Sequence, residues 1–160
     1  MPLPQLDNLV RTGQLKAEPG AQAEIDGLIR SGTVRLKDAG NSTNSLESRF
    51  DLAYSAAHAL SLAALRWHGY RSENRYLVFQ SLTHTLKLPA EQWRVLDQAH
   101  RKRNQAEYEG DLDIDEALLA ALIRVAGDVA KGVAALGPLT KGRSRFAVSI
   151  AVSMRQPETF

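Results

Sequence analysis

The chain of 160 residues contains no cysteine, which excludes disulfide scaffolds, thiolate zinc sites and cysteine nucleophiles. It also lacks any run of about 18 uncharged apolar residues, so the sequence predicts no transmembrane helix and no membrane partner. Residues 1–6 do not combine a basic segment with an apolar run, the pattern of a secretory leader. We therefore expect a cytoplasmic protein that is long enough to bury its own core as one domain.

Histidines are few, and they are poorly spaced for metal binding. None of the four, at positions 58, 68, 84 and 100, lies three or four residues from another, so no helical pair of ligands forms. The sequence also lacks a glycine-rich phosphate loop and a Gly-x-Ser-x-Gly elbow, which leaves nucleoside triphosphatases and serine hydrolases without support. We expect no metal and no cofactor.

An excess of charge of one sign is likewise absent. Twenty basic and eighteen acidic side chains give a net charge of +2, too small to indicate nucleic-acid binding by bulk electrostatics. Residues 140–160 are locally basic, with Lys141, Arg143, Arg145 and Arg155 against Glu158. Any nucleic-acid contact must therefore be argued from a local group of residues.

What the sequence does contain is helical periodicity. Hydrophobic residues recur at helical spacing over about residues 21–39, 44–68, 76–88, 89–110 and 113–137. Asn44 with Glu47, and Asp113 with Glu116, form capping boxes that predict two helix starts, and Pro89 is expected in the first turn of the fourth helix. The sequence predicts an all-α, antiparallel four- to five-helix bundle over residues 1–139, with its core in residues 44–135.

The second of these helices is apolar almost all round, which predicts that it lies at the centre of the bundle. Phe50, Tyr54, Ala57 and Leu60 form one of its apolar stripes. We expect these four side chains to be buried against neighbouring helices.

Residues 140–160 follow a different pattern, because apolar residues alternate from Phe146 to Met154. Alternation indicates a strand, which would have to pair with a partner or across a dimer, or remain disordered. Phe146, Ile150 and Met154 also fit one face of a short helix. These alternatives stay open.

The candidate functional site is at the end of the fourth predicted helix, before Gly110. His100, Asn104 and Tyr108 lie four residues apart and form one polar row, with Arg103 on the adjacent row. Arginine offers a fixed fork of donors for phosphate oxygens, so this face suggests phosphate or nucleotide handling. The alternative is a solvated face with an ion pair between Arg103 and Glu107.

Three features together resemble the HEPN superfamily of small helical-bundle proteins: residues 49–60, the Gly69-Tyr70-Arg71 turn, and Arg103-Asn104 followed by Tyr108. The resemblance implies a dimer of four- or five-helix bundles, often the toxin of a toxin–antitoxin pair or the partner of a nucleotidyltransferase. Many members are metal-independent ribonucleases, whose signature is an arginine followed four to six residues later by a histidine. Here Tyr108 stands where that histidine is expected.

This departure bears directly on the chemistry. Arg103 can stabilise a charged phosphate and Asn104 can orient it, but Tyr108, with a reference pKa near 10, is a poor proton acceptor at neutral pH. His100, one turn before Asn104, is the alternative base. Arg103 and Tyr108 point about 140° apart on an ideal helix, which favours a site shared by two chains in a dimer.

Two functional hypotheses follow from the sequence. The first is a homodimer that binds RNA or a nucleotide in a dimer cleft and acts as a metal-independent endoribonuclease toxin, through Arg103, Asn104 and Tyr108 or His100. The second is a non-catalytic helical scaffold that uses the same surface to bind a protein partner. The Arg103-Asn104 pair favours the first hypothesis, and the missing histidine favours the second.

Overall fold

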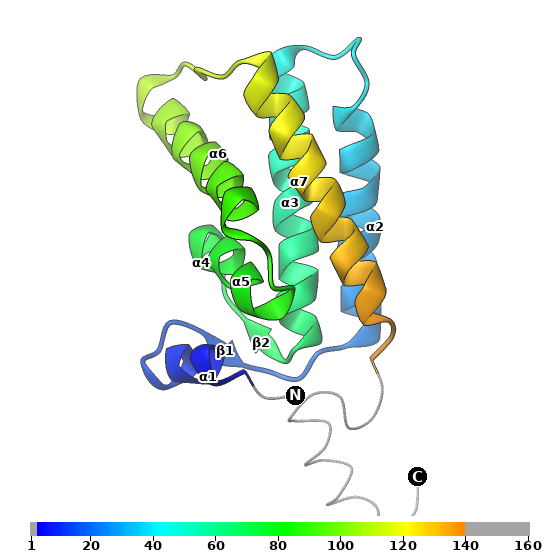
Figure 1. The fold of residues 1–160 in the computed structure, drawn as a ribbon, viewed down its shortest axis with the longest axis vertical. Coiled ribbons are helices and arrows are strands. Elements are labelled where there is room, and N and C mark those ends of the chain that lie inside the picture. The colour runs from blue at the N-terminus through cyan, green and yellow to red at the C-terminus, as the bar shows by residue number, and fades with distance from the viewer. Residues whose placement is uncertain (1–2, 140–160) are drawn as a thin grey trace, which may run out of the picture.

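The structure, a computed structural model, describes residues 3–139 of the chain. Its long helices are α2 (Gln22–Ala39), α3 (Leu46–Trp67), α6 (Ala90–Glu109) and α7 (Glu116–Leu136). The short elements are α1 (Pro4–Arg11), β1 (Lys16–Ala17), β2 (Tyr70–Arg71), α4 (Arg75–Gln80) and α5 (Leu82–Thr85). The predicted all-α class is confirmed: the helices pack into a bundle with one small two-stranded sheet (Figure 1). The predicted strand or helix after Phe146 lies outside the described residues.

Helix α3 lies at the centre, between α2 and α7 (Figure 1). Helix α6 leans away from these three helices at its C-terminal end (Figure 1). Phe50, Ala57 and Leu60 are fully buried and Tyr54 is 1% exposed, as the sequence predicted. Burial of almost every face of α3 explains why its sequence shows no polar side. The core also extends before residue 44, because Ile25 of α2 belongs to it.

A glycine allows α2 to pack closely against α3. A Cβ atom added at Gly32 of α2 would lie 2.6 Å from Cγ of Leu60 on α3. Gly27, on another face of α2, has only the end of a flexible arginine near its missing Cβ. The two glycines of α2 therefore differ: packing against α3 requires Gly32, whereas no contact requires Gly27.

Both predicted capping boxes are wrong, because each helix begins slightly later. The hydroxyl of Ser45, not the side chain of Asn44, accepts from the backbone N–H of Ser48 at 3.1 Å and caps α3. Asp115, not Asp113, accepts from the N–H of Leu118 at 2.8 Å and caps α7. In each case two residues of good capping type stand close together, and burial of the following apolar residues selects between them.

The third predicted helix is interrupted, and Pro89 lies just outside the fourth. Ser81 separates α4 from α5, and its hydroxyl donates to the carbonyl of Leu77 at 2.8 Å. Such a side-chain bond competes with the regular helical ladder. Lys87 then adopts a left-handed conformation with φ of 56°, and Pro89 serves as the extended N-cap of α6 rather than a residue of its first turn.

The N-terminal segment, which the sequence pattern did not reveal, closes one end of the bundle. Strand β1 pairs antiparallel with β2, and α1 packs beside this sheet (Figure 1). Leu6, Leu15 and Tyr70 belong to a second, smaller apolar cluster there. The hydroxyl of Tyr70 donates to Asp7 at 2.7 Å, so a polar contact also joins α1 to the sheet.

Beside the sheet, a buried arginine belongs to a cluster of four charged side chains. Arg66 is 1% exposed, donates to Glu24 at 3.0 Å, and also donates to the backbone carbonyls of Glu18, Pro19 and Tyr70 at 2.9, 2.8 and 3.1 Å. Arg71 bridges both carboxylates, at 2.7 Å to Glu18 and 2.5 Å to Glu24. Burial raises the pKa of Glu24, but the Arg71 and Arg66 guanidiniums outweigh it and hold that pKa below its ordinary value.

No helix within residues 3–139 is both long enough and apolar enough to cross a membrane. The longest, α3 and α7, carry their apolar side chains into the core of the bundle instead.

Candidate functional site

The candidate residues lie on the half of α6 that precedes its end at Gly110. Leu96 and Ala99 of this helix are fully buried, which turns the row that contains His100 and Asn104 toward the edge of the bundle. Gly110 ends the helix in the left-handed conformation, with φ of 74°, as predicted. The amphipathic pattern of α6 therefore fixes which of its polar side chains face α3 and α4.

His100 is held between two side chains. Its Nδ1 atom lies 2.9 Å from the hydroxyl of Tyr54 on α3, and its Nε2 atom lies 3.1 Å from the amide nitrogen of Asn104. The Tyr54 bond joins positions far apart in the chain, whereas the Asn104 bond is made within one helical turn. Two of the predicted site residues, His100 and Asn104, are thus in direct contact.

Arg103 and Arg75 both approach the ring of Tyr54. The guanidinium carbon of Arg103 lies 4.8 Å from the ring centroid and that of Arg75, from α4, lies 5.7 Å from it. Both distances are within the range of a cation–π contact. Arg75 is exposed and makes no ion pair with any residue of the described segment 3–139. Two guanidinium groups from different helices therefore share one aromatic ring beside His100.

The histidines beside these arginines are in their neutral form at neutral pH. Burial lowers the pKa of His100, and Arg75, Arg101 and Arg103 lower it further, while Asp97 opposes them. Burial also lowers the pKa of His58, one turn after Tyr54, to about 4, with Arg75 and Arg103 as further causes. Apart from burial, the two arginines therefore contribute positive potential at both imidazoles, which disfavours another cation and favours an anion.

The hydroxyl of Tyr54 is not a source of negative charge at this site. Burial raises the pKa of Tyr54, while Arg75 and Arg103 partly oppose the rise. The phenol therefore stays protonated at neutral pH and acts as a neutral hydrogen-bond partner.

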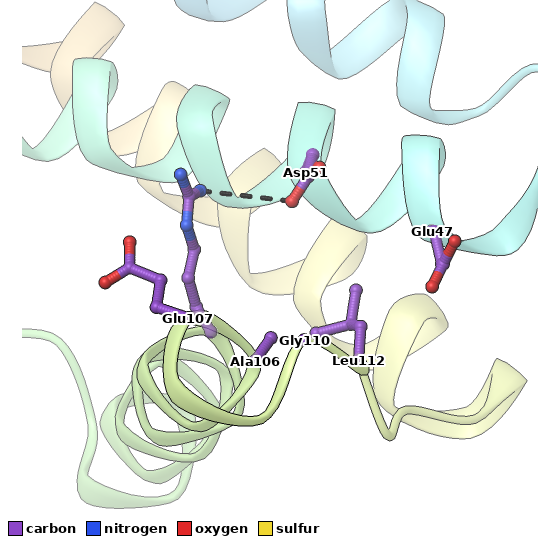
Figure 2. Close-up of a pocket in the computed structure, with 7 residues that line it drawn as sticks. Glu47, Asp51, Ala106, Glu107, Gly110 and Leu112 are labelled. Atoms are coloured by element: carbon purple, nitrogen blue, oxygen red, sulfur yellow. Dashed lines mark ion pairs between the residues drawn. The ribbon is translucent and has the colours of Figure 1, made fainter.

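A pocket of about 330 Å³ opens beside Arg103, between the start of α3 and the end of α6 (Figure 2). Glu47 and Asp51 line it on the α3 side, and Ala106 and Glu107 on the α6 side. Nη1 of Arg103 lies 4.0 Å from Asp51, an ion-pair contact too long for a hydrogen bond. The pocket is therefore lined by one guanidinium and three carboxylates.

The predicted ion pair between Arg103 and Glu107 does not form within the described residues, because Arg103 extends across to Asp51 on α3. Tertiary contact replaces the local pair that the spacing on α6 suggested. The side chain of Arg103 is 27% exposed, so it is partly enclosed rather than free on a solvated face.

Tyr108 lies apart from this group. It is 90% exposed, and it makes no hydrogen bond or ring contact with other residues of the described chain. The structure thus brings together His100, Asn104 and Arg103 within one chain, but not Tyr108.

Sequence reasoning missed Arg75 and Asp51 and assigned Tyr54 only a packing role. Arg75 is the first residue of α4, after the Asn74 cap, and Asp51 belongs to an exposed position of α3. Their roles arise from contacts between helices, for which helical periodicity carries no signal. The one available signal was the polar hydroxyl of Tyr54 on an otherwise apolar stripe, because buried tyrosine hydroxyls usually have a partner.

Within residues 3–139, no group of three or more metal-ligating side chains is arranged to hold a metal ion. No protein-family model matches the chain, and no curated protein and no solved structure is detectably similar to it.

Proposed function

We propose that the protein binds the phosphate of an RNA or nucleotide beside Tyr54 and acts as a metal-independent endoribonuclease of the HEPN type. The observation that carries this proposal is the convergence of Arg75 and Arg103 on the Tyr54 ring, next to a neutral His100. Guanidinium groups are the side chains best suited to phosphate oxygens, and two of them meet here at the edge of the bundle.

The chemistry requires a cationic group and a proton acceptor. In cleavage, the ribose 2′-oxygen attacks phosphorus, the bond from phosphorus to the 5′-oxygen breaks, and the proton passes in net terms from the first oxygen to the second. The products are a 2′,3′-cyclic phosphate and a 5′-hydroxyl. Arg103 and Arg75 would stabilise the charged phosphate oxygens, and the neutral imidazole of His100 would accept the 2′-proton.

Of the two residues that the sequence left open for proton transfer, this assignment chooses His100 and not Tyr108. Tyr108 is 90% exposed and has no hydrogen-bond partner among the described residues that could exchange a proton with it. His100, by contrast, lies on the same polar face as Arg103 and carries two hydrogen-bond contacts that orient its ring.

A homodimer remains part of the proposal, as does an antitoxin or nucleotidyltransferase partner. One chain already brings His100, Asn104 and Arg103 together, so the site does not depend on a second copy for these residues. A dimer would enlarge the site by placing two such faces in one cleft.

A second candidate function is a non-catalytic scaffold that binds a protein partner. The observation that favours it is the pocket next to Arg103, which Glu47, Asp51 and Glu107 also line. Three carboxylates repel a continuing phosphate backbone and attract basic side chains of another protein.

Incubation of the purified protein with RNA in EDTA distinguishes the two functions. We expect cleavage that leaves 2′,3′-cyclic phosphate ends, lost in Arg103→Ala and in His100→Ala. Arg94→Ala is the matched control, because Arg94 is exposed on the same helix and lies two turns before the site. Absence of both cleavage and RNA binding in the wild type would reject the nuclease and favour the scaffold.

A further inference from the structure

The contact between Tyr54 and His100 is built more rigidly than the rest of the site. Tyr54 is 1% exposed, and its ring stacks on Phe50 at 6.4 Å and meets the edge of Phe79 at 5.5 Å between centroids. A ring packed on both sides has little freedom to turn, so its hydroxyl is a fixed partner for Nδ1 of His100.

The second contact of His100 indicates where the imidazole proton resides. In the orientation that its amide adopts here, Asn104 presents its nitrogen to Nε2 at 3.1 Å; this nitrogen can only donate, which makes Nε2 the acceptor in this arrangement. In a neutral ring the other nitrogen then carries the proton. Nδ1 therefore donates to the hydroxyl oxygen of Tyr54, 2.9 Å away.

We propose that Tyr54 is a positioning residue that keeps the proton of neutral His100 on Nδ1, so that Nε2 is the atom that accepts the proton of the attacking hydroxyl. The inference rests on the proposed function, since it names the atom that performs its proton transfer. Asn104 is exposed, and its amide covers Nε2 until the substrate hydroxyl takes its place. In this arrangement Tyr54 holds the imidazole, His100 acts as the base, and Asn104 occupies Nε2 until the substrate displaces it.

Removal of one oxygen atom tests this arrangement. Tyr54→Phe keeps the ring and its contacts with Phe50 and Phe79 but leaves Nδ1 of His100 without its partner. The amide of Asn104 can then turn over and accept a proton from Nε2 through its own oxygen. We expect the tautomer equilibrium to shift by about tenfold toward protonation at Nε2, which lowers the fraction of the protein in which Nε2 is free to act as the base.

Tyr76→Phe is the matched control. The ring of Tyr76 lies 5.4 Å from that of His100 between centroids, but no hydrogen bond joins the two side chains. Both variants therefore remove a hydroxyl from a tyrosine that neighbours His100, and only one of these hydroxyls touches the imidazole.

The experiment combines nitrogen NMR of the histidine rings at neutral pH with RNA cleavage kinetics. We expect the wild type and Tyr76→Phe to carry the His100 proton on Nδ1. In Tyr54→Phe we expect the tautomer equilibrium to shift toward Nε2 and kcat to fall by about tenfold, the effect of one neutral hydrogen bond, with little change in KM. A merely structural role for Tyr54 would alter stability without moving the proton.

Two results would overturn the inference: a wild-type His100 with its proton on Nε2, or a Tyr54→Phe variant in which the proton does not move. The failure of the proposed function is recognised separately. If the wild type does not cleave RNA, that function is rejected, while the NMR spectra still decide whether Tyr54 sets the tautomer.

Discussion

Replacement of Arg66 by methionine should remove a large part of the stability of the fold. The guanidinium of Arg66 is buried and donates to one carboxylate and three backbone carbonyls, whereas methionine keeps only the apolar part of the side chain. The change removes the donor from the three carbonyls and from one oxygen of Glu24, whose other oxygen keeps its bond to Arg71, in a place that water reaches poorly. Burial without a partner is the costly outcome for such groups.

The magnitude follows from the contacts. Four hydrogen bonds from a charged donor, at about 1.5–3 kcal/mol each, would sum to a value comparable with the whole stability of a domain. Partial access of water to the freed groups reduces this sum, and loss of one partner from a buried charge pair usually costs about 3–5 kcal/mol. We expect that loss for Arg66→Met, which corresponds to a fall in Tm of roughly 10–20 °C.

Arg71→Met is the matched control in urea denaturation. Arg71 also bonds to the carboxylate of Glu24, and to that of Glu18, but its side chain is 31% exposed and makes no hydrogen bond to the three carbonyls. We expect a loss of about 1 kcal/mol or less, as for an exposed ion pair. Equal losses for the two variants would refute the argument that burial, rather than charge pairing, makes Arg66 important.

Three further predictions concern stability. Phe50→Ala should lower the free energy of unfolding in denaturant melts by about 3–5 kcal/mol. Val34→Ala, at a side chain that is 54% exposed, should lower it little, and similar losses for the two variants would mean that α3 is not central. Gly32→Ala should destabilise the protein because the new Cβ would meet Leu60 of α3, while Gly27→Ala should stabilise α2 by about 0.5–1 kcal/mol. If calorimetry showed stability changes of the same sign for both variants, the packing of α2 against α3 would be contradicted. Because the pKa of Glu24 is below its ordinary value of 4.5, its contribution is present above that pH and is lost as the pH falls through the lowered pKa. Urea melts from pH 7 to 3 should therefore show a steeper acid loss in the wild type than in Glu24→Gln, and parallel curves would argue against the ion network.

The elements that the sequence predicted are those whose evidence is local. Periodicity over 22 residues in α3 and 21 in α7, and a glycine at the end of α6, are properties of neighbouring residues. The capping boxes failed because Asn44 and Ser45 are both good caps, and the choice depends on how far the apolar face of α3 is buried. The local sequence therefore predicts that a helix exists, whereas tertiary packing decides at which residue the helix begins.

The parts that could not be predicted depend on contacts between distant residues. Arg66 occupies a helix position that reads as a solvated charge, and its burial follows only when Glu18, Glu24 and the turn after α3 surround it. At the candidate site, Arg103, His100 and Asn104 were identified from their spacing on one helix. Arg75 was not, because its place beside Tyr54 is decided by how α4 crosses α3.

The pairing of β1 with β2 also affects the order in which the fold is completed. Lys16 pairs with Arg71 across the whole of α2 and α3, so this contact closes a long loop, whereas the α2–α3 hairpin needs only local contacts. We expect the helices to associate before the N-terminal segment closes over them. Interactions that form after the transition state chiefly slow unfolding. The N-terminal segment would therefore lower the unfolding rate and leave the folding rate almost unchanged.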